Sequence, residues 1–244
     1  MKTHSRDIPR LFFDIETTAM KGVEDWIPEP KVDKRLKDQE TAKADKIAEM
    51  IEKAPLDPDL ATVRLISMQI GTGGVPTIIL VPSKKMSKAR TQELAGKLYP
   101  YPTTPAIKVL SETNAITAFW GALAMCNGCS VGYNTLAFDL PFLMRRSMDL
   151  RIQPGITPSM AKYRTEPTTD LYGALFNWSW EGGKKFKWVM DRYGIEVLAP
   201  EQDGSMVADM TDEELITYGL SDLHGTVELY QRMNGIYFNH LGGE

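Results

Sequence analysis

The segment Leu11-Phe12-Phe13-Asp14-Ile15-Glu16-Thr17 sets two acidic side chains into an apolar run. Its apolar residues predict a buried strand. Because residues i and i+2 of a strand point to the same side, we expect Asp14 and Glu16 side by side within the core. Two neighbouring carboxylates away from water repel each other and lose hydration, so the fold must offset that cost. A divalent cation with oxygen ligands is the obvious candidate.

The charge and the first residues of the chain bear on its partners and its location. The formal net charge of -4 weighs mildly against nucleic acid as a partner, except where metal ions lie between acidic ligands and phosphates. No apolar run is long enough for a membrane span. The first residues lack the apolar core of a signal peptide, so we expect a cytoplasmic protein with no membrane partner.

The only cysteines, Cys126 and Cys129, are spaced C-x-x-C. A zinc site needs more ligands, and no second Cys or His pair stands at a suitable spacing. We therefore expect small, semi-buried thiols, with a redox disulfide as the less favoured alternative.

A polar insertion follows the first strand, over about 22–58. The spacing of Ile47, Met50, Ile51 and Ala54 predicts an amphipathic helix in its second half. We expect this helix to be solvated and packed on the surface. A cover over a substrate channel is the alternative.

Two more strands are predicted at Val63–Gly71 and Val75–Val81, joined by a glycine-rich turn. With the first strand they form three antiparallel strands at one edge of a sheet. Helices then alternate with a short strand, which indicates one α/β domain over 1–244, with a mixed β-sheet flanked by helices. The expected elements are helices at Ser111–Met125, ending at Met148, opening at Thr169, around Phe186–Gly194 and over Thr211–Met233, a strand at Ser130–Tyr133, and a loop over Ile152–Arg164 with room for a short strand.

Two further groups of polar residues stand later in the sequence, on or beside these predicted elements. Asn134 and Asp139 come after the strand at Ser130–Tyr133, and ligand sites in α/β sheets gather at such strand ends. Tyr218 and Asp222 are four residues apart on a predicted helix, so they share one face. Each group alone also has a structural explanation, such as an N-cap at Asp139 or a hydrogen-bonded surface pair. The order of the groups is more specific than any one of them.

Taken in order, the three groups carry a resemblance. They are Phe13-Asp14-Ile15-Glu16-Thr17, Tyr133-Asn134-Thr135-Leu136-Ala137-Phe138-Asp139 and Tyr218-Gly219-Leu220-Ser221-Asp222. The chain resembles the DEDD superfamily of 3′-5′ exonucleases, which have a ribonuclease H-like fold. The second group is similar to the N-x-x-x-F-D form in proofreading domains of family B DNA polymerases. The third has Tyr in place of His, as in the DEDDy branch. The insertion and the lack of further domains depart from the family pattern.

This resemblance implies a metal-dependent enzyme that hydrolyses single-stranded DNA from its 3′ end to nucleoside monophosphates. It makes Asp14, Glu16, Asp139 and Asp222 the ligands of two divalent cations, Mg²⁺ or Mn²⁺, and gives Tyr218 the task of orienting a water molecule. Two cations a few ångströms apart clamp the attacking and leaving oxygens of an in-line phosphoryl displacement. A phenol titrates near about 10, so we do not expect Tyr218 to act as a true base.

Five residues are candidate substrate contacts. Thr17, Asn134 and Phe138 belong to the motifs, and Trp178 and Trp180 stand beside Gly182-Gly183. Aromatic rings between cations suit a single strand, whose bases stack while its phosphates pair. Basic residues cluster in three places, although most of them are better explained as solvated outer faces: Lys84, Lys85, Lys88 and Arg90; Arg145 and Arg146; Lys184, Lys185 and Lys187.

Two alternatives to a DNA exonuclease stay open. One is an exoribonuclease of the same superfamily, because contacts to the 2′-hydroxyl lie outside the motifs. The other is a nuclease fold that binds nucleic acid without activity. The expected partners are 3′ ends of single-stranded DNA, RNA as the alternative, and replication or repair proteins.

Overall fold

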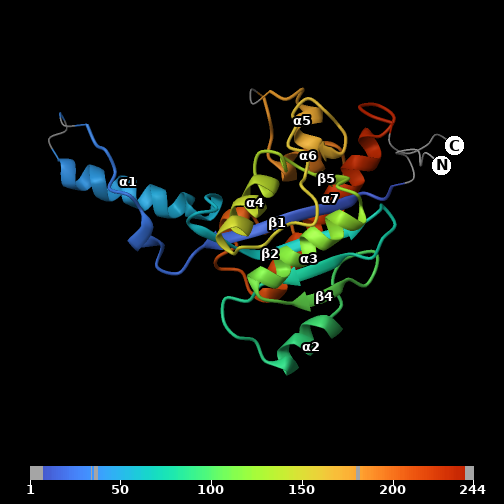
Figure 1. Cartoon of the computed structure of the whole chain (residues 1–244), viewed down its shortest axis with the longest axis horizontal. Helices are drawn as coiled ribbons and strands as arrows, with labels where there is room; N and C mark the ends of the chain where they lie inside the picture. The colour runs from blue at the N-terminus through green and yellow to red at the C-terminus, as the bar shows by residue number, and fades with distance from the viewer. Residues whose placement is uncertain (1–7, 34, 36–37, 180–181, 240–244) are drawn as a thin grey trace.

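A six-stranded mixed sheet forms the centre of the molecule, in the order β4-β3-β2-β1-β5-β6 (Figure 1). The computed structural model describes residues 8–33, 35, 38–179 and 182–239. The first three strands are antiparallel, β5 and β6 run parallel to β1 and to each other, and β4 runs parallel to β3. This sheet confirms the predicted α/β class. The strands are β1 (Leu11–Ala19), β2 (Ala61–Ile70), β3 (Thr77–Leu80), β4 (Ala106–Val109), β5 (Ser130–Gly132) and β6 (Thr168–Asp170).

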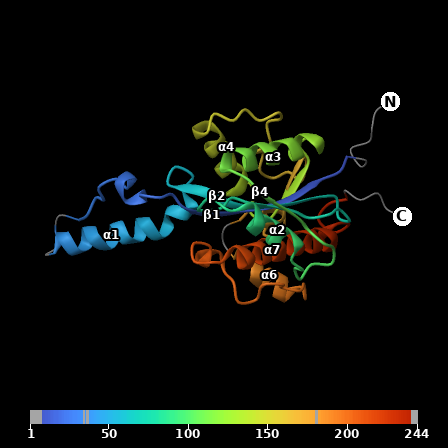
Figure 2. The same cartoon turned by 90° about the horizontal axis from the view of Figure 1, so that it is seen from below.

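Helices cover both faces of the sheet (Figure 2). Helices α3 and α4 lie on one face, and α6 and α7 lie on the other. In the part of the chain that the structure describes, no helix has the length and apolarity needed to cross a membrane. The helices are α1 (Gln39–Lys53), α2 (Lys88–Gly96), α3 (Glu112–Met125), α4 (Asp139–Asp149), α5 (Leu171–Leu175), α6 (Phe186–Arg192) and α7 (Asp212–Met233), with short 3-10 turns η2 (Val23–Trp26), η3 (Ala54–Leu56) and η4 (Gly204–Met206).

The two faces of β1 pack into different cores. Phe13 points to the α3 side, where its ring centroid lies 4.9 Å from that of Phe119. Phe12 points to the α7 side, 5.1 Å from the ring of Tyr230. Because side chains alternate along a strand, the acids at positions 14 and 16 share the face of Phe12. They therefore point toward α7.

The longest helix, α7, begins with a capping box. The Thr211 hydroxyl accepts a hydrogen bond from the Glu214 amide at 3.3 Å, and the Glu214 carboxylate accepts one from the Thr211 amide at 2.8 Å. This reciprocal pair satisfies amides that would otherwise lack partners at the helix start. The predicted start of this helix at Thr211 is thus confirmed, and the cap fixes where the helix carrying Tyr218 and Asp222 begins.

Most of the predicted elements are confirmed, with three differences. The three predicted antiparallel strands are present, but they do not form an edge of the sheet, because β4 lies outside β3 and parallel to it. The helix expected to open at Thr169 is preceded by β6 and begins at Leu171. Residues 152–164 form a loop without a strand. The two cysteines are buried and free, at the end of α3 and in the turn after it.

The insertion forms an arm that projects from one end of the sheet (Figures 1 and 2). Its helix α1 is confirmed, but the expectation that it packs on the domain surface is not, since none of its side chains is buried. Lys43 pairs with Glu29 at 2.9 Å, which ties α1 to the extended segment before it. The arm is anchored at its base, where the Thr17 hydroxyl donates to the Pro55 carbonyl at 2.6 Å.

Candidate active site

Three acids from β1 and α7 meet in one place. Carboxylate oxygens of Asp14, Glu16 and Asp222 all lie within 4.8 Å of one another. The first two share a strand face, and α7 crosses that face with Asp222 toward them. The structure thus brings together three of the four acids that the motifs single out. Such a group could hold a metal ion.

A glycine allows α7 to approach the sheet closely. A Cβ atom on Gly219 would lie 2.1 Å from Cδ2 of Leu65 and 3.7 Å from Cβ of Ser67, both on β2. Any larger residue would therefore displace the buried Leu65 side chain or push α7 away from the strands. Asp222 is one helical turn after Gly219, so its reach toward Asp14 depends on this contact.

Asp14 and Glu16 lie in a poorly hydrated environment. Burial, and then the nearby carboxylates of Glu16 and Asp139, raise the pKa of Asp14 well above its usual range. Burial, and then the carboxylate of Asp222, raise the pKa of Glu16 in the same direction. The Oδ2 atom of Asp14 is buried and has no hydrogen-bond partner within the described part of the chain. A buried acceptor without a donor is costly, and a cation would satisfy it.

Asp139 adjoins the three acids without being one of the group. It is 3% exposed, and its Oδ1 accepts a hydrogen bond from the Ile15 amide at 3.2 Å. Burial raises the pKa of Asp139 to about 7, although this bond opposes the shift by favouring the charged form. Asp139 contributes to the raised pKa of Asp14, which places it close by. The fourth acid thus stands at the border of the cluster.

The phenol of Tyr218 lies against Asp222, one turn earlier on α7. Its hydroxyl is close enough to the Asp222 carboxylate to influence the pKa of that group. Burial raises the pKa of Asp222 to about 7, and the nearby hydroxyl of Tyr218 opposes that shift. Burial, and then the negative charges of Asp222 and Glu16, raise the pKa of the phenol far above its usual range. Tyr218 therefore remains a neutral hydrogen-bond donor at any ordinary pH.

The corner that leads to Asp139 is held by Asp170, at the end of β6. Its carboxylate accepts hydrogen bonds from the amides of Asn134 at 3.1 Å and Leu136 at 2.9 Å. It also caps α5 through the Gly173 amide at 3.0 Å. Asn134 has a positive φ of 62°, a conformation that Asn tolerates better than most residues. Asp170 thus fixes the turn between β5 and α4.

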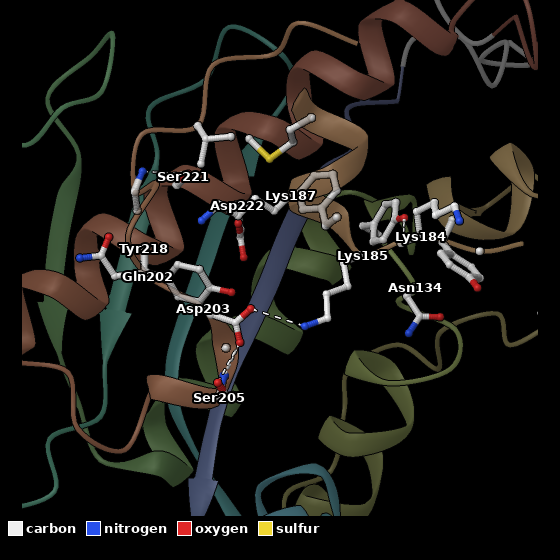
Figure 3. A pocket seen from close by; sticks show the side chains of 18 of the residues that line it. Asn134, Lys184, Lys185, Lys187, Gln202, Asp203, Ser205, Tyr218, Ser221 and Asp222 are labelled. Carbon is white, nitrogen blue, oxygen red and sulfur yellow. Dashed lines mark hydrogen bonds and ion pairs between the residues drawn. The ribbon is translucent and has the colours of Figure 1, made fainter. Parts of the chain in front are cut away.

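A cleft of about 640 Å³ opens beside the acids (Figure 3). Tyr218 and Asp222 lie on one side, and the basic residues Lys184, Lys185 and Lys187 line it as well. Asp203 points into the same space, 3.7 Å from Nζ of Lys185. The amide and hydroxyl of Ser205 hold the pKa of Asp203 below its usual range, so this group is charged at neutral pH.

The motifs did not identify Asp203 or Asp170. The segment Asp203-Gly204-Ser205 is a common turn sequence, which carries no sign that it lies beside Tyr218. Asp170 stands at the start of a predicted helix, where a cap explains an acid without reference to any site. Only the fold shows that both support the same cleft.

The residues predicted to contact the substrate lie in different parts of the structure. Asn134 lines the cleft. Thr17 is buried and bonded to the base of the arm, and Phe138 packs against Phe142 with ring centroids 5.6 Å apart. Trp178 lies over Gly173 and lines a separate small pocket, which also includes Asn134. Trp180 lies outside the described residues.

No protein-family model matches this chain. A search of curated proteins finds no match either. The functional argument therefore depends on the residues and their geometry.

Proposed function

We propose that this protein is a metal-dependent 3′-5′ exonuclease with a ribonuclease H-like fold, acting on single-stranded DNA and releasing nucleoside monophosphates. The strand order and directions are compatible with that fold. One observation carries the proposal: Asp222 meets Glu16 and Asp14, which stand 206 and 208 positions earlier, around a buried Asp14 oxygen that lacks a hydrogen-bond partner among the described residues.

The donor set fits Mg²⁺ or Mn²⁺. All of the ligand atoms on offer are carboxylate oxygens, which these cations prefer. Asp14, Glu16 and Asp222 would hold one ion, and Asp139 stands where it would help to hold a second. Bound cations would supply Lewis acidity and lower the pKa of a coordinated water.

The remaining groups position the substrate and the water. Tyr218 keeps its proton, so it serves as a donor that orients a water molecule or a phosphate oxygen beside Asp222. The lysines of the cleft lie where they can pair with the phosphates of the strand. Asn134, on its fixed corner, offers an amide to the substrate backbone.

The test uses a 20-nucleotide single-stranded DNA labelled at its 5′ end, incubated with Mn²⁺ or Mg²⁺. We expect a ladder that shortens by one nucleotide at a time, with no products in EDTA. Asp14→Asn should abolish the ladder, and Glu201→Gln, which alters an exposed acid, should leave it unchanged. An intact oligonucleotide with every metal would contradict the proposal.

The same assay separates the two alternatives. A matched RNA oligonucleotide that is degraded faster than the DNA would indicate an exoribonuclease. A stable complex in a gel-shift assay, without cleavage of either strand, would indicate a binding module. Four acids that repel one another give a pure binding module no advantage, which is why we favour the enzyme.

A further inference from the structure

Two segments at the same end of the sheet carry opposite charge. The arm, 22–58, has ten acidic and seven basic residues. The segment 83–90, which covers the end of the link between β3 and α2 and the first three residues of α2, has four basic residues and no acidic one. Because β1 and β3 run in the same direction, the arm after β1 and the basic segment after β3 leave the sheet at the same end. A polyanion near the cleft would be attracted to one and not to the other.

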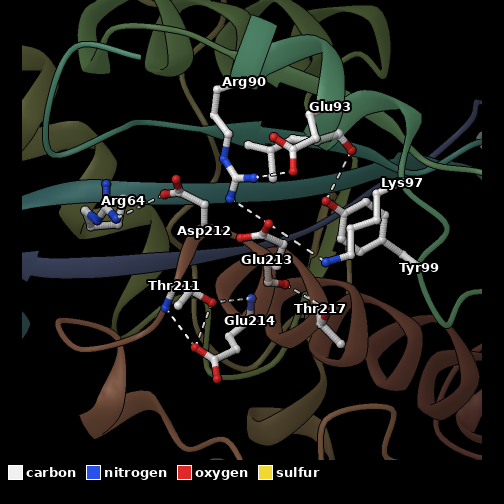
Figure 4. A network of polar contacts seen from close by, with 11 residues as sticks. Arg64, Arg90, Glu93, Lys97, Tyr99, Thr211, Asp212, Glu213, Glu214 and Thr217 are labelled. Carbon is white, nitrogen blue, oxygen red and sulfur yellow. Dashed lines mark hydrogen bonds and ion pairs between the residues drawn. The ribbon is translucent and has the colours of Figure 1, made fainter. Parts of the chain in front are cut away.

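Of the four basic residues in segment 83–90, one forms ion pairs with acidic side chains, and the other three form none within the described residues. Arg90 pairs with Glu93 at 2.8 Å and with Glu213 at 2.5 Å (Figure 4). Lys84, Lys85 and Lys88 are exposed, and within the described residues none of them makes an ion pair. Fixed positive charge without a protein partner is what a phosphate backbone neutralises.

The three acidic residues at the start of α7, between this segment and the cleft, already form ion pairs or hydrogen bonds within the protein. Asp212 lies 3.8 Å from Arg64, and Glu213 pairs with Arg90 and with Lys97. Glu214 forms the capping box of α7. Figure 4 shows these contacts grouped at the first turn of α7. Unpaired acids of that turn therefore do not stand between the cleft and the basic segment to repel a nucleic-acid strand.

The ion pair between Arg90 and Glu213 allows the distance from the basic segment to Asp222 to be estimated along α7. Glu213 precedes Asp222 by nine residues on α7, which is about 13 Å at 1.5 Å per residue. A stacked strand advances about 3.4 Å per nucleotide, so this gap corresponds to about four nucleotides. The Arg90 contact thus lies about four nucleotides from the acids, and Lys88 stands two residues before Arg90 in the chain.

We propose that Lys84, Lys85 and Lys88 form a second phosphate-binding surface, which holds the single strand about four nucleotides upstream of its 3′ end. The strand leaves the cleft toward α2 and avoids the acidic arm. This inference rests on the proposed function, since it names where the rest of that same substrate lies. It predicts that affinity depends on strand length beyond what the cleft itself covers.

The test measures binding of 5′-labelled DNA by fluorescence anisotropy in EDTA, for a 20-mer and a trimer at several salt concentrations. In the variant Lys84→Gln, Lys85→Gln, Lys88→Gln we expect the 20-mer to bind at least tenfold more weakly at low salt. The slope of log affinity against log salt should fall by about 2, at 0.7 for each lost phosphate contact. Trimer binding should be unchanged.

Two further variants serve as controls. Lys43→Gln, Lys46→Gln, Lys53→Gln removes the same charge from the arm and should leave 20-mer binding and its salt slope unchanged. Replacing Lys84, Lys85 and Lys88 by arginine should preserve binding, which excludes a loss caused by misfolding. An unchanged salt slope in the first variant, or equal weakening by the arm variant, would overturn the inference. Wild-type hydrolysis of the trimer, measured separately with Mn²⁺, tests the proposed function by itself.

Discussion

The Ile15 amide donates a hydrogen bond to Oδ1 of Asp139 at 3.2 Å, across 124 positions of sequence. Ile15 is the residue between the two acids of β1, so the bond joins that strand to the start of α4 at the site itself. It orients Asp139 beside the cluster and occupies one of its oxygens. The remaining oxygen is the one that Asp139 has to offer a cation.

The first prediction concerns Asp14→Asn. Removing one of several repelling buried charges should raise the melting temperature in EDTA, because the metal-free cluster is electrostatically unfavourable. The same change should remove the stabilisation by Mn²⁺, which for a single intact site is about 2.7 kcal/mol at a concentration 100 times Kd. Thermal melts with increasing Mn²⁺ measure both effects. Equal metal-induced shifts in the variant and the wild type would show that Asp14 is not a ligand.

The second prediction concerns Tyr218→Phe. Loss of the hydroxyl should lower kcat about 10²-fold, as expected for a group that positions the reacting water. Mn²⁺ binding should persist, since the carboxylates are kept. Tyr237→Phe, at an exposed tyrosine, is the matched control, and an equal loss of rate in that variant would count against the role of Tyr218.

The third prediction is a pH dependence of stability in EDTA. The folded state raises the pKa of Asp139 and of Asp222 from 3.8 to about 7, so between these values it binds more protons than the unfolded chain. Stability from these groups is present below about pH 4 and is lost as the pH rises through 7. The melting temperature should therefore fall more steeply from pH 5 to pH 8 in the wild type than in Asp139→Asn, Asp222→Asn. Identical slopes would mean that neither carboxyl has the raised pKa.

The fourth prediction concerns Asp170→Ala. The change leaves the amides of Asn134, Leu136 and Gly173 without their acceptor in a buried corner. We expect a loss of about 2–4 kcal/mol in the free energy of unfolding, at 1–3 kcal/mol for each unsatisfied buried group with partial relaxation. Urea unfolding measures the loss. Asp170→Asn keeps one acceptor and should lose less, and the reverse order would contradict the proposed role.

The fifth prediction concerns Gly219→Ala. The added methyl group overlaps the buried Leu65 side chain, so Leu65 must repack or α7 must shift outward, at a cost of about 1–3 kcal/mol. Mn²⁺ affinity should also fall, because an outward shift separates Asp222 from Asp14. Calorimetric titration with Mn²⁺ measures this. Gly121→Ala, where a Cβ meets nothing within 4 Å, is the control and should leave affinity unchanged.

The sequence predicted those parts of the fold that have strong periodicity or clear caps. The apolar run of β1, the glycine turn between β2 and β3, and the cap at Thr211 each have a local physical signal. Strand alternation predicted that Asp14 and Glu16 lie side by side, and helix spacing predicted that Tyr218 and Asp222 share a face. That Asp222 meets the two acids of β1 was implied only by the resemblance to the DEDD exonucleases.

The elements that were missed lack such signals. Strand β6, Thr168–Asp170, is three polar residues long and is held at the edge of the sheet by β5. Strand β4 is an exposed four-residue edge, and in α2 only Leu94 is buried. The contacts of Asp170 and Asp203 join segments distant in sequence, which no local pattern reveals. The direction of the arm is likewise set by where β1 and β2 end in space.

The most direct test of the central claim is a crystal of the protein soaked in Mn²⁺, measured for anomalous scattering. We predict a manganese peak bounded by the carboxylates of Asp14, Glu16 and Asp222, with a second peak toward Asp139 when a nucleotide is present. An anomalous map with no peak among these carboxylates, at a Mn²⁺ concentration that supports hydrolysis in solution, would contradict the account.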